Sequence, residues 1–246
     1  MDITTIVLIA GLICLAAALY TSIGHGGASA YLAIMALFAV PAATMKPTAL
    51  VLNLIASALT AARFIRAGQF NPRLFWMFAI PAIPMAFLGG RFALPPEYYR
   101  PLVGIVLWAA AARLLWSKPL PCLFDVRAPS LRIAVPTGAG LGLLAGLTGT
   151  GGGIFLSPLI LLLGWEEPRK TSGVAAAFIL ANSAAGLAGA LPSLRHLSPE
   201  LPWFAGASLV GAVIGTSFGV SRLPRPVLLQ VLGVVLTIAG AKLIFT

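Results

Sequence analysis

The chain has 246 residues, of which 59% are hydrophobic and only 9% are charged, and its mean hydropathy is +1.00. Such a chain cannot cover itself with an ordinary water-facing surface, which excludes a soluble globular protein and predicts an integral membrane protein. The net charge of +10 would also fit a nucleic-acid-binding protein. However, Lys and Arg fall almost entirely between apolar segments, where orientation in the membrane explains them, so we expect a lipid bilayer and no nucleic acid as partner.

Apolar segments of membrane length predict an all-α polytopic protein with about eight helical segments. The first runs from Ile3 to Tyr20, is interrupted at Gly24–Gly27 and resumes from Ala28 to Val40. Asp2 and the lack of a basic start favour a mature segment over a cleaved signal peptide. The other segments are expected at Thr48–Ile65, Leu74–Phe92 and Leu102–Trp116, then from Ile133 to Leu163 with an interruption at Gly149–Gly153, and finally at Thr171–Leu191, Leu201–Val220 and Val227–Phe245.

The two halves of the chain resemble each other, which favours an internal duplication over chance matching among abundant residue types. The glycine-rich interruptions lie 125 residues apart, and each is followed by a polar helix start that carries a lysine. We expect a first transmembrane repeat over residues 1–116, a polar linker over 117–132 and a second repeat over 133–246. Internally repeated membrane chains are typical of secondary transporters. The matching residues are Lys46 with Lys170, Pro72 with Pro199, Trp76 with Trp203, and Leu94-Pro95 with Leu223-Pro224.

The distribution of Lys and Arg bears on how the repeats are oriented. If all eight segments cross the membrane, the basic residues divide into nine on one side and seven on the other. If each interrupted segment is a re-entrant hairpin, they divide into eleven and five, which the positive-inside rule prefers. Three true crossings per half would make the repeats inverted. The length of Ile3–Tyr20 keeps a parallel repeat with eight crossings as the alternative.

Both interruptions, Gly24-His25-Gly26-Gly27 and Gly149-Thr150-Gly151-Gly152-Gly153, place neighbouring glycines inside apolar sequence. Glycine runs unwind a helix and expose backbone N–H groups, which lipid tolerates only around a buried site or cavity. The helix that follows begins with N–H groups lacking intrahelical partners, and its dipole favours negative charge. We therefore predict that the two turns meet near the midplane and bind a small oxyanion. The alternative is close helix packing, which we expect instead for two regularly spaced ladders, Gly138, Gly142 and Gly146, and Gly211, Gly215 and Gly219.

The same features resemble the TauE/SafE sulfite exporter family of four-helix-repeat membrane transporters over essentially the whole chain. The resemblance implies a multi-pass protein of the bacterial cytoplasmic (inner) membrane that moves small sulfur-containing anions such as sulfite, thiosulfate or organosulfonates. The first interruption departs from the family pattern, because it contains His25 and because Ala28 stands where the family usually keeps a third glycine. The residues that carry the resemblance are the two interruptions, the helix starts Lys46-Pro47-Thr48-Ala49 and Arg169-Lys170-Thr171-Ser172, and Asn53 and Asn182-Ser183 in the helices that follow.

Polar side chains in the helices after each interruption are further candidates for substrate binding, because neutral donors line a pathway without burying charge. Asn53 and Asn182 are the strongest of them, followed by Ser57, Thr171 and Ser183. The alternative for the asparagines is an interhelical hydrogen bond, and the alternative for the hydroxyls is a bond back to their own helix.

His25 is the titratable side chain placed within an interruption, whereas every acidic residue lies in an expected loop or terminus. No buried carboxylate relay is therefore expected, and a coupled proton would travel on His25 or on the protonated anion itself. The alternative for His25 is a neutral ring that donates one hydrogen bond. Arg63, Arg66 and Arg113 lie near helix ends and are expected to extend toward the interface.

Enzyme motifs are lacking in the chain. Gly-x-Ser-x-Gly and His-Glu-x-x-His do not occur, and Gly149–Gly153 continues into Ile-Phe rather than the Gly-Lys-Ser/Thr ending of a Walker A motif. Cys14 and Cys122 form no CxxC and lie near no histidine cluster, so we expect no disulfide framework, metal or cofactor. We predict a secondary transporter that moves small anions by alternating access. An anion channel is the alternative, and the short loops disfavour a membrane sensor or scaffold.

Overall fold

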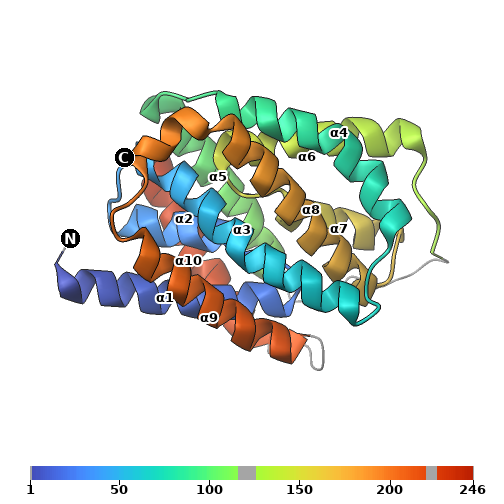
Figure 1. The fold of residues 1–246 in the computed structure, drawn as a ribbon, viewed down its shortest axis with the longest axis horizontal. Helices are drawn as coiled ribbons and strands as arrows, with labels where there is room; N and C mark the ends of the chain where they lie inside the picture. The colour runs from blue at the N-terminus through green and yellow to red at the C-terminus, as the bar shows by residue number, and fades with distance from the viewer. Residues whose placement is uncertain (1, 116–125, 220–225, 246) are drawn as a thin grey trace.

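The computed structural model describes residues 2–115, 126–219 and 226–245, and these residues form helices and connecting loops without a strand (Figure 1). Six helices in this part of the chain are long and apolar enough to cross a membrane, namely α1, α3, α4, α6, α8 and α9. The all-α polytopic prediction is confirmed. The elements are α1 (Ile3–Ser22), α2 (Ala28–Leu37), α3 (Ala42–Arg66), α4 (Pro72–Arg91), α5 (Pro96–Leu115), α6 (Leu131–Thr148), α7 (Gly153–Leu162), α8 (Pro168–Gly189), the 3₁₀ helix η1 (Leu191–His196), α9 (Leu201–Gly219) and α10 (Pro226–Phe245).

Several helices begin earlier than hydropathy predicts, because their first turns are polar or contain proline. Helix α3 begins at Ala42 rather than Thr48, with Pro41 at the cap position, where its carbonyl accepts from Met45 N at 3.2 Å. Helices α5 and α8 begin at Pro96 and Pro168, since the first helical position needs no N–H donor. The predicted polar helix start at Lys46 is therefore wrong, because Lys46 lies inside α3.

Two smaller differences concern the connections. The six-residue helix η1 follows α8 and is absent from the predicted segments, and α6 begins at Leu131, two residues before the expected segment start at Ile133. Residues 116–125, which form most of the predicted linker, lie outside the described residues.

Helices α4 and α6 run parallel and pack through small residues along one edge of the bundle (Figure 1). A Cβ atom on each of three α6 glycines would collide with a carbonyl oxygen of α4, at a constant offset of 60 residues. This confirms that the first glycine ladder serves close helix packing. The contacts join Gly138 to Phe78, Gly142 to Ala82 and Gly146 to Ala86.

Helices α1 and α9 form the same kind of parallel pair at the opposite edge (Figure 1). Gly211 packs on Cys14 O and Gly215 packs on Ala18 O, at a constant offset of 197 residues. The second glycine ladder is thus confirmed for these two positions, whereas the surroundings of Gly219 lie outside what the structure describes.

Helices α3 and α8 pack against each other in the middle of the bundle and run antiparallel. Asn53 of α3 bonds to Ser183 of α8. Leu50, one turn before Asn53, packs on Gly186, which lies one turn after Ser183, so the two helices run in opposite directions. Helices α5 and α10 also lie against each other, with Trp108 Nε1 donating to Thr237 O at 3.1 Å.

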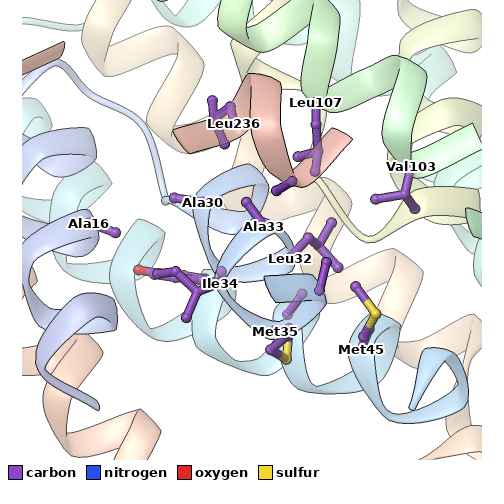
Figure 2. Close-up of a cluster of buried hydrophobic side chains, with 14 of the residues drawn as sticks. Ala16, Ala30, Leu32, Ala33, Ile34, Met35, Met45, Val103, Leu107 and Leu236 are labelled. Atoms are coloured by element: carbon purple, nitrogen blue, oxygen red, sulfur yellow. The ribbon is translucent and has the colours of Figure 1, made fainter. Parts of the chain in front are cut away.

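Helix α2 lies inside the bundle, since every residue from Ala28 to Ala36 is buried. Large apolar side chains on the outer helices, such as Trp76, Ile80 and Trp203, are instead exposed, as a lipid-facing surface requires. Figure 2 shows the side chains of Ala30, Leu32, Ala33, Ile34 and Met35 of α2 surrounded by those of Ala16 on α1, Met45 on α3, Val103 and Leu107 on α5 and Leu236 on α10.

Candidate functional site

The two glycine-rich segments form the turns between α1 and α2 and between α6 and α7. We call them the first turn (Gly24–Gly27) and the second turn (Gly149–Gly152). The residue that precedes each short helix, Gly27 or Gly152, has a left-handed φ of 101° or 76°, which a residue with a Cβ rarely adopts. Glycine is therefore required for the chain to leave one helix and start the next across only five residues (23–27) or four residues (149–152).

Both turns approach the same side chain, Asn53 of α3. A Cβ atom on Gly26 would collide with Asn53 Oδ1, and a Cβ atom on Gly151 would collide with Asn53 Nδ2. The Cγ2 atom of Ile179 on α8 would lie 3.1 Å from the first of these Cβ atoms and 2.8 Å from the second. Asn53 is fully buried, and its Nδ2 donates to Ser183 Oγ at 2.8 Å. The fold thus brings the two turns together where α3 and α8 cross.

Each turn also packs on the other half of the chain. Gly24 of the first turn lies against the backbone of Ser172, close to the start of α8. Gly149 of the second turn lies against Lys46, close to the start of α3, where a Cβ atom would be 3.2 Å from Lys46 O. Each turn therefore packs near the start of a long helix from a distant part of the chain.

Backbone N–H groups at the starts of α2 and α7 have no acceptor within their helices. Tyr31 N donates to Gly27 O at 3.0 Å, and Phe155 and Leu156 both donate to Gly152 O at 3.2 Å. Earlier positions of a helix have no carbonyl to bond to, and the helix dipole adds positive charge there. Both helix starts thus favour an anion. The N–H groups concerned are those of Ala28, Ser29 and Ala30 in α2 and of Gly153 and Ile154 in α7.

The first turn is held by a tyrosine hydroxyl. Tyr31 Oη donates to Gly26 O at 2.8 Å and lies 3.0 Å from Ser208 Oγ on α9, which is 3.4 Å from Leu52 O. In a trans peptide the N–H of the next residue points opposite to the carbonyl. Tyr31 therefore directs the N–H of Gly27 away from itself.

The second turn is held by different side chains. Tyr99 Oη of α5 donates to Thr148 O at 3.1 Å. Thr148 Oγ1 donates to Leu144 O at 2.7 Å and lies 2.9 Å from Thr150 Oγ1. Thr150, a predicted site residue, is thus hydrogen-bonded within its own turn.

His25 of the first turn is buried beside Tyr20. Its backbone N–H donates to Tyr20 O at 2.9 Å, and the two rings meet edge to face with centroids 6.2 Å apart. Tyr20 Oη accepts from Ser29 Oγ at 2.7 Å. The histidine is therefore placed within the apolar interior, as expected, and its role as a proton carrier stays a prediction.

Several buried polar atoms of α3 and α8 have no hydrogen-bond partner among the described residues. Asn53 Oδ1 is one, and both polar atoms of the Asn182 carboxamide and Thr171 Oγ1 are others. Buried polar groups are normally paired with protein, water or a ligand. These atoms are thus available to a bound solute or to water. Ser57 donates back to Leu54 O at 3.4 Å, the alternative expected for a hydroxyl.

Two buried charged residues were missed from the sequence. Lys46 is 7% exposed. Hydropathy places Lys46 at a helix start, where a lysine is expected to be exposed, and so it gives no sign of this burial. Pro41 is the sequence signal for the earlier start of α3. Glu166 lies in a loop, as expected, yet it is 3% exposed and accepts a hydrogen bond from Asn71 Nδ2. A loop position thus does not exclude burial of a carboxylate, although no buried carboxylate relay was expected on that ground. Among the described residues no group of three or more His, Cys, Asp or Glu could hold a metal ion.

Comparison with known proteins decides the family. Residues 8–243 match the family model described as "Sulfite exporter TauE/SafE". The chain belongs to the TauE/SafE sulfite exporter family. A protein of Sinorhizobium fredii (strain NBRC 101917 / NGR234), described as "Probable membrane transporter protein y4hK", is 38% identical over 229 residues, which cover 92% of this chain and 93% of that protein. No solved structure matches the chain.

The family assignment confirms the resemblance drawn from the glycine turns and helix starts. The chain is thus a multi-pass membrane transporter of the TauE/SafE family. Its substrate and the residues that bind it follow from neither comparison.

Proposed function

We propose that the chain is a secondary transporter of small anions, with sulfite, thiosulfate and organosulfonates as the substrate class. The substrate binds between the first and second turns and is moved across the bacterial cytoplasmic membrane by alternating access. The observation that carries the proposal is the approach of Gly26 and Gly151 to the two polar atoms of one buried carboxamide, that of Asn53.

The chemistry of the two turns suits an oxyanion. Two helix starts offer N–H donors, and the glycines let a ligand approach the backbone closely because no side chain intervenes. Asn182, buried on α8 next to the Ser183 partner of Asn53, has a carboxamide without a partner in the described residues. We assign it to the same pathway. These contacts are neutral, so they would bind an anion without a permanently buried counter-ion at the point of contact.

The packing directions support an inverted repeat with re-entrant hairpins. Helices α3 and α8 occupy equivalent places in the two halves and run antiparallel, whereas equivalent helices of a parallel repeat would share one direction. The pair α4 and α6 corresponds to the pair α9 and α1, and both are parallel. This agrees with two halves that are exchanged by a two-fold axis in the membrane plane, with one turn entering from each side.

Proton coupling through His25 belongs to the same proposal. His25 lies in the turn whose carbonyl at Gly26 is held by Tyr31, so a change in its charge would act on the binding N–H groups directly. A channel for the same anions differs only in whether both gates open together. The family is one of transporters, which favours a carrier over both a channel and an enzyme.

The test is a binding screen of the purified chain against sulfite, thiosulfate, sulfate and methanesulfonate, followed by flux into proteoliposomes. We expect saturable binding of at least one sulfur-containing anion, and flux that is accelerated when the same anion is present on the opposite side. Flux that does not saturate and shows no such exchange would assign a channel. Absence of binding to all four anions would contradict the proposed substrate class.

A further inference from the structure

Each glycine turn joins two helix ends of opposite polarity. Helix α6 ends at Thr148 and α7 begins at Gly153, while α1 ends at Ser22 and α2 begins at Ala28. A helix carries about half a positive charge at its start and about half a negative charge at its end. Because the two ends are a few residues apart, their fields oppose each other, so an anion gains less from a broken helix than from an isolated helix start.

A further negative helix end lies beside the second turn. The last turn of α4 packs on the last turn of the parallel helix α6, where a Cβ atom on Gly89 would lie 2.8 Å from Leu147 N. Both helices therefore direct their carbonyl ends to the same place, one turn before Gly149. Without a compensating charge, these two ends would repel an anion at the second turn.

Lys46 supplies a positive charge at this place. Its Nζ donates to three carbonyl oxygens at the end of α4, those of Gly89 at 3.1 Å, Gly90 at 3.0 Å and Phe92 at 3.0 Å. Its Cγ would lie 3.5 Å from a Cβ atom on Gly149 of the second turn. No acidic residue occurs in α3, α4 or α6, so the charge is offset by carbonyl dipoles and not by a carboxylate of these helices.

Arg63, at the other end of α3, bonds to α9 where α9 packs on the last turns of α1, the helix that leads into the first turn. Its Nη1 lies 2.9 Å from Val213 O, 2.7 Å from Thr216 Oγ1 and 2.8 Å from Ser217 Oγ, in the last two turns of α9. The neighbouring Gly215 packs on Thr21 in the last turn of α1. The guanidinium of Arg63 thus bonds to α9 near the ends of both helices, and its extension to the interface stays a prediction.

We propose that Lys46 and Arg63, the two basic residues that α3 directs at these helix ends, give the transport pathway its selectivity for anions. This inference rests on the proposed anion transport. Lys46 offsets the carbonyl ends of α4 and α6 beside the second turn, and Arg63 adds positive charge near the ends of α9 and α1, so the positive helix starts of α7 and α2 dominate the field that the substrate meets. The effect of Lys46 exceeds that of Arg63, because Lys46 is more buried and its field is screened less by solvent.

The test compares a dianion with a monoanion. Binding of thiosulfate and of methanesulfonate to the purified chain is measured for the wild type and for Lys46→Met. Because Coulomb energy is proportional to ligand charge, a loss of about ten-fold for the monoanion predicts about a hundred-fold for the dianion. Lys46→Arg, which keeps the charge, is expected to keep the wild-type ratio of the two affinities. A merely structural role of Lys46 would lower both affinities by one common factor.

Lys242 provides the matched control. Its Nζ donates to Leu37 O at 3.1 Å, so it also serves a helix end with its ammonium group, but at the end of α2 that is remote from the first turn. We expect Lys242→Met to leave the ratio of the two affinities unchanged. An unchanged ratio of the two affinities in Lys46→Met would overturn the inference, whatever the ratio in Lys242→Met.

The same measurement separates this inference from the proposed function. If the wild type binds none of sulfite, thiosulfate, sulfate and methanesulfonate, the substrate class fails and the charge inference fails with it. If the wild type binds both and Lys46→Met changes both equally, the charge inference alone fails. If Lys46→Met does not fold, Arg63→Gln carries the test. We expect a smaller loss of anion affinity, again about twice as large in logarithmic units for the dianion as for the monoanion. Equal losses of the two affinities in Arg63→Gln would overturn the inference.

Discussion

The first and second turns use the same backbone device but are held by unrelated side chains. At the first turn, Tyr31 and Ser208 hold the carbonyl of Gly26, and α2 is buried along almost its whole length. At the second turn, Tyr99 and a pair of threonines hold the end of α6, and the last residue of α7, Leu162, is exposed. The difference teaches that glycine meets the conformational demand of the turn, while any hydroxyl within reach can hold the turn in place.

The two turns also differ in charge. The first contains a titratable residue, His25, whereas the second contains none and lies instead against the ammonium-bearing side chain of Lys46. We infer that the turns divide the work of the site, with the pH response at the first turn and the more deeply buried fixed charge, that of Lys46, at the second. The predictions below test this division.

The largest effect is expected from Gly151→Leu. The left-handed φ of 74° opposes any side chain, and a Cβ atom would collide with Asn53, so the two turns can no longer approach each other. We expect flux into proteoliposomes to be abolished while the chain remains in the membrane. Gly140→Leu is the control, because Gly140 on α6 has no atom within 4 Å of its Cβ position. Retained flux in Gly151→Leu would count heavily against a site between the turns.

Asn53→Ala removes the side chain that both turns share. Hydrogen bonds to charged groups contribute about 1.5–3 kcal/mol, so we expect anion affinity to fall by about 10- to 100-fold, measured by calorimetry. Ser57→Ala, one turn further along α3, should change the affinity little because its hydroxyl bonds back to Leu54 O. Equal losses in the two variants would mean that Asn53 acts through packing and not through the substrate.

Tyr31→Phe and Tyr99→Phe each remove one hydroxyl that holds one turn. A hydrogen bond between neutral groups contributes about 0.5–1.5 kcal/mol, so each variant should lose about two- to ten-fold in anion affinity. Unequal losses would show which turn contributes more to binding. If both variants bind as tightly as the wild type, neither hydroxyl positions the site.

His25→Ala is expected to have the smallest effect on binding and a distinct effect on pH dependence. Anion affinity near neutral pH should change by less than about three-fold, because the binding donors are backbone N–H groups and the Asn53 carboxamide. The pH dependence of flux should flatten, since histidine is the side chain that ordinarily changes charge near neutrality. An unchanged pH profile would remove the proton role from His25 and assign coupling to the protonated anion.

Comparison of expectation with structure shows which features were local. The ladder of Gly138, Gly142 and Gly146 on α6 is predictable from its four-residue spacing, which depends on one helix alone. Helix starts were misplaced where hydropathy was the only guide, at Lys46 in particular. Proline at Pro41 and at Pro168 marked the true starts, because the first turn of a helix needs no N–H donors.

The candidate site was predicted less completely, because its partners are distant in the chain. Asn53 and Asn182 were treated alike, but the fold places Asn53 against both turns, whereas no contact of Asn182 with either turn is established. The burial of Lys46 and Glu166 escaped prediction for the same reason. Lys46 meets the end of α4, more than forty residues away, and Glu166 meets Asn71, 95 residues away.

The sequence by itself determined a membrane protein of helices, the transporter family and the places where glycine interrupts the apolar segments. Composition, helical spacing and the conformational freedom of glycine are properties of neighbouring residues, so they can be inferred without knowledge of the tertiary structure. Only the tertiary structure decided that both turns approach Asn53, and that α3 directs Lys46 at the helix ends beside the second turn and Arg63 at α9. These are contacts between elements far apart along the chain, and they depend on the directions in which the helices pack.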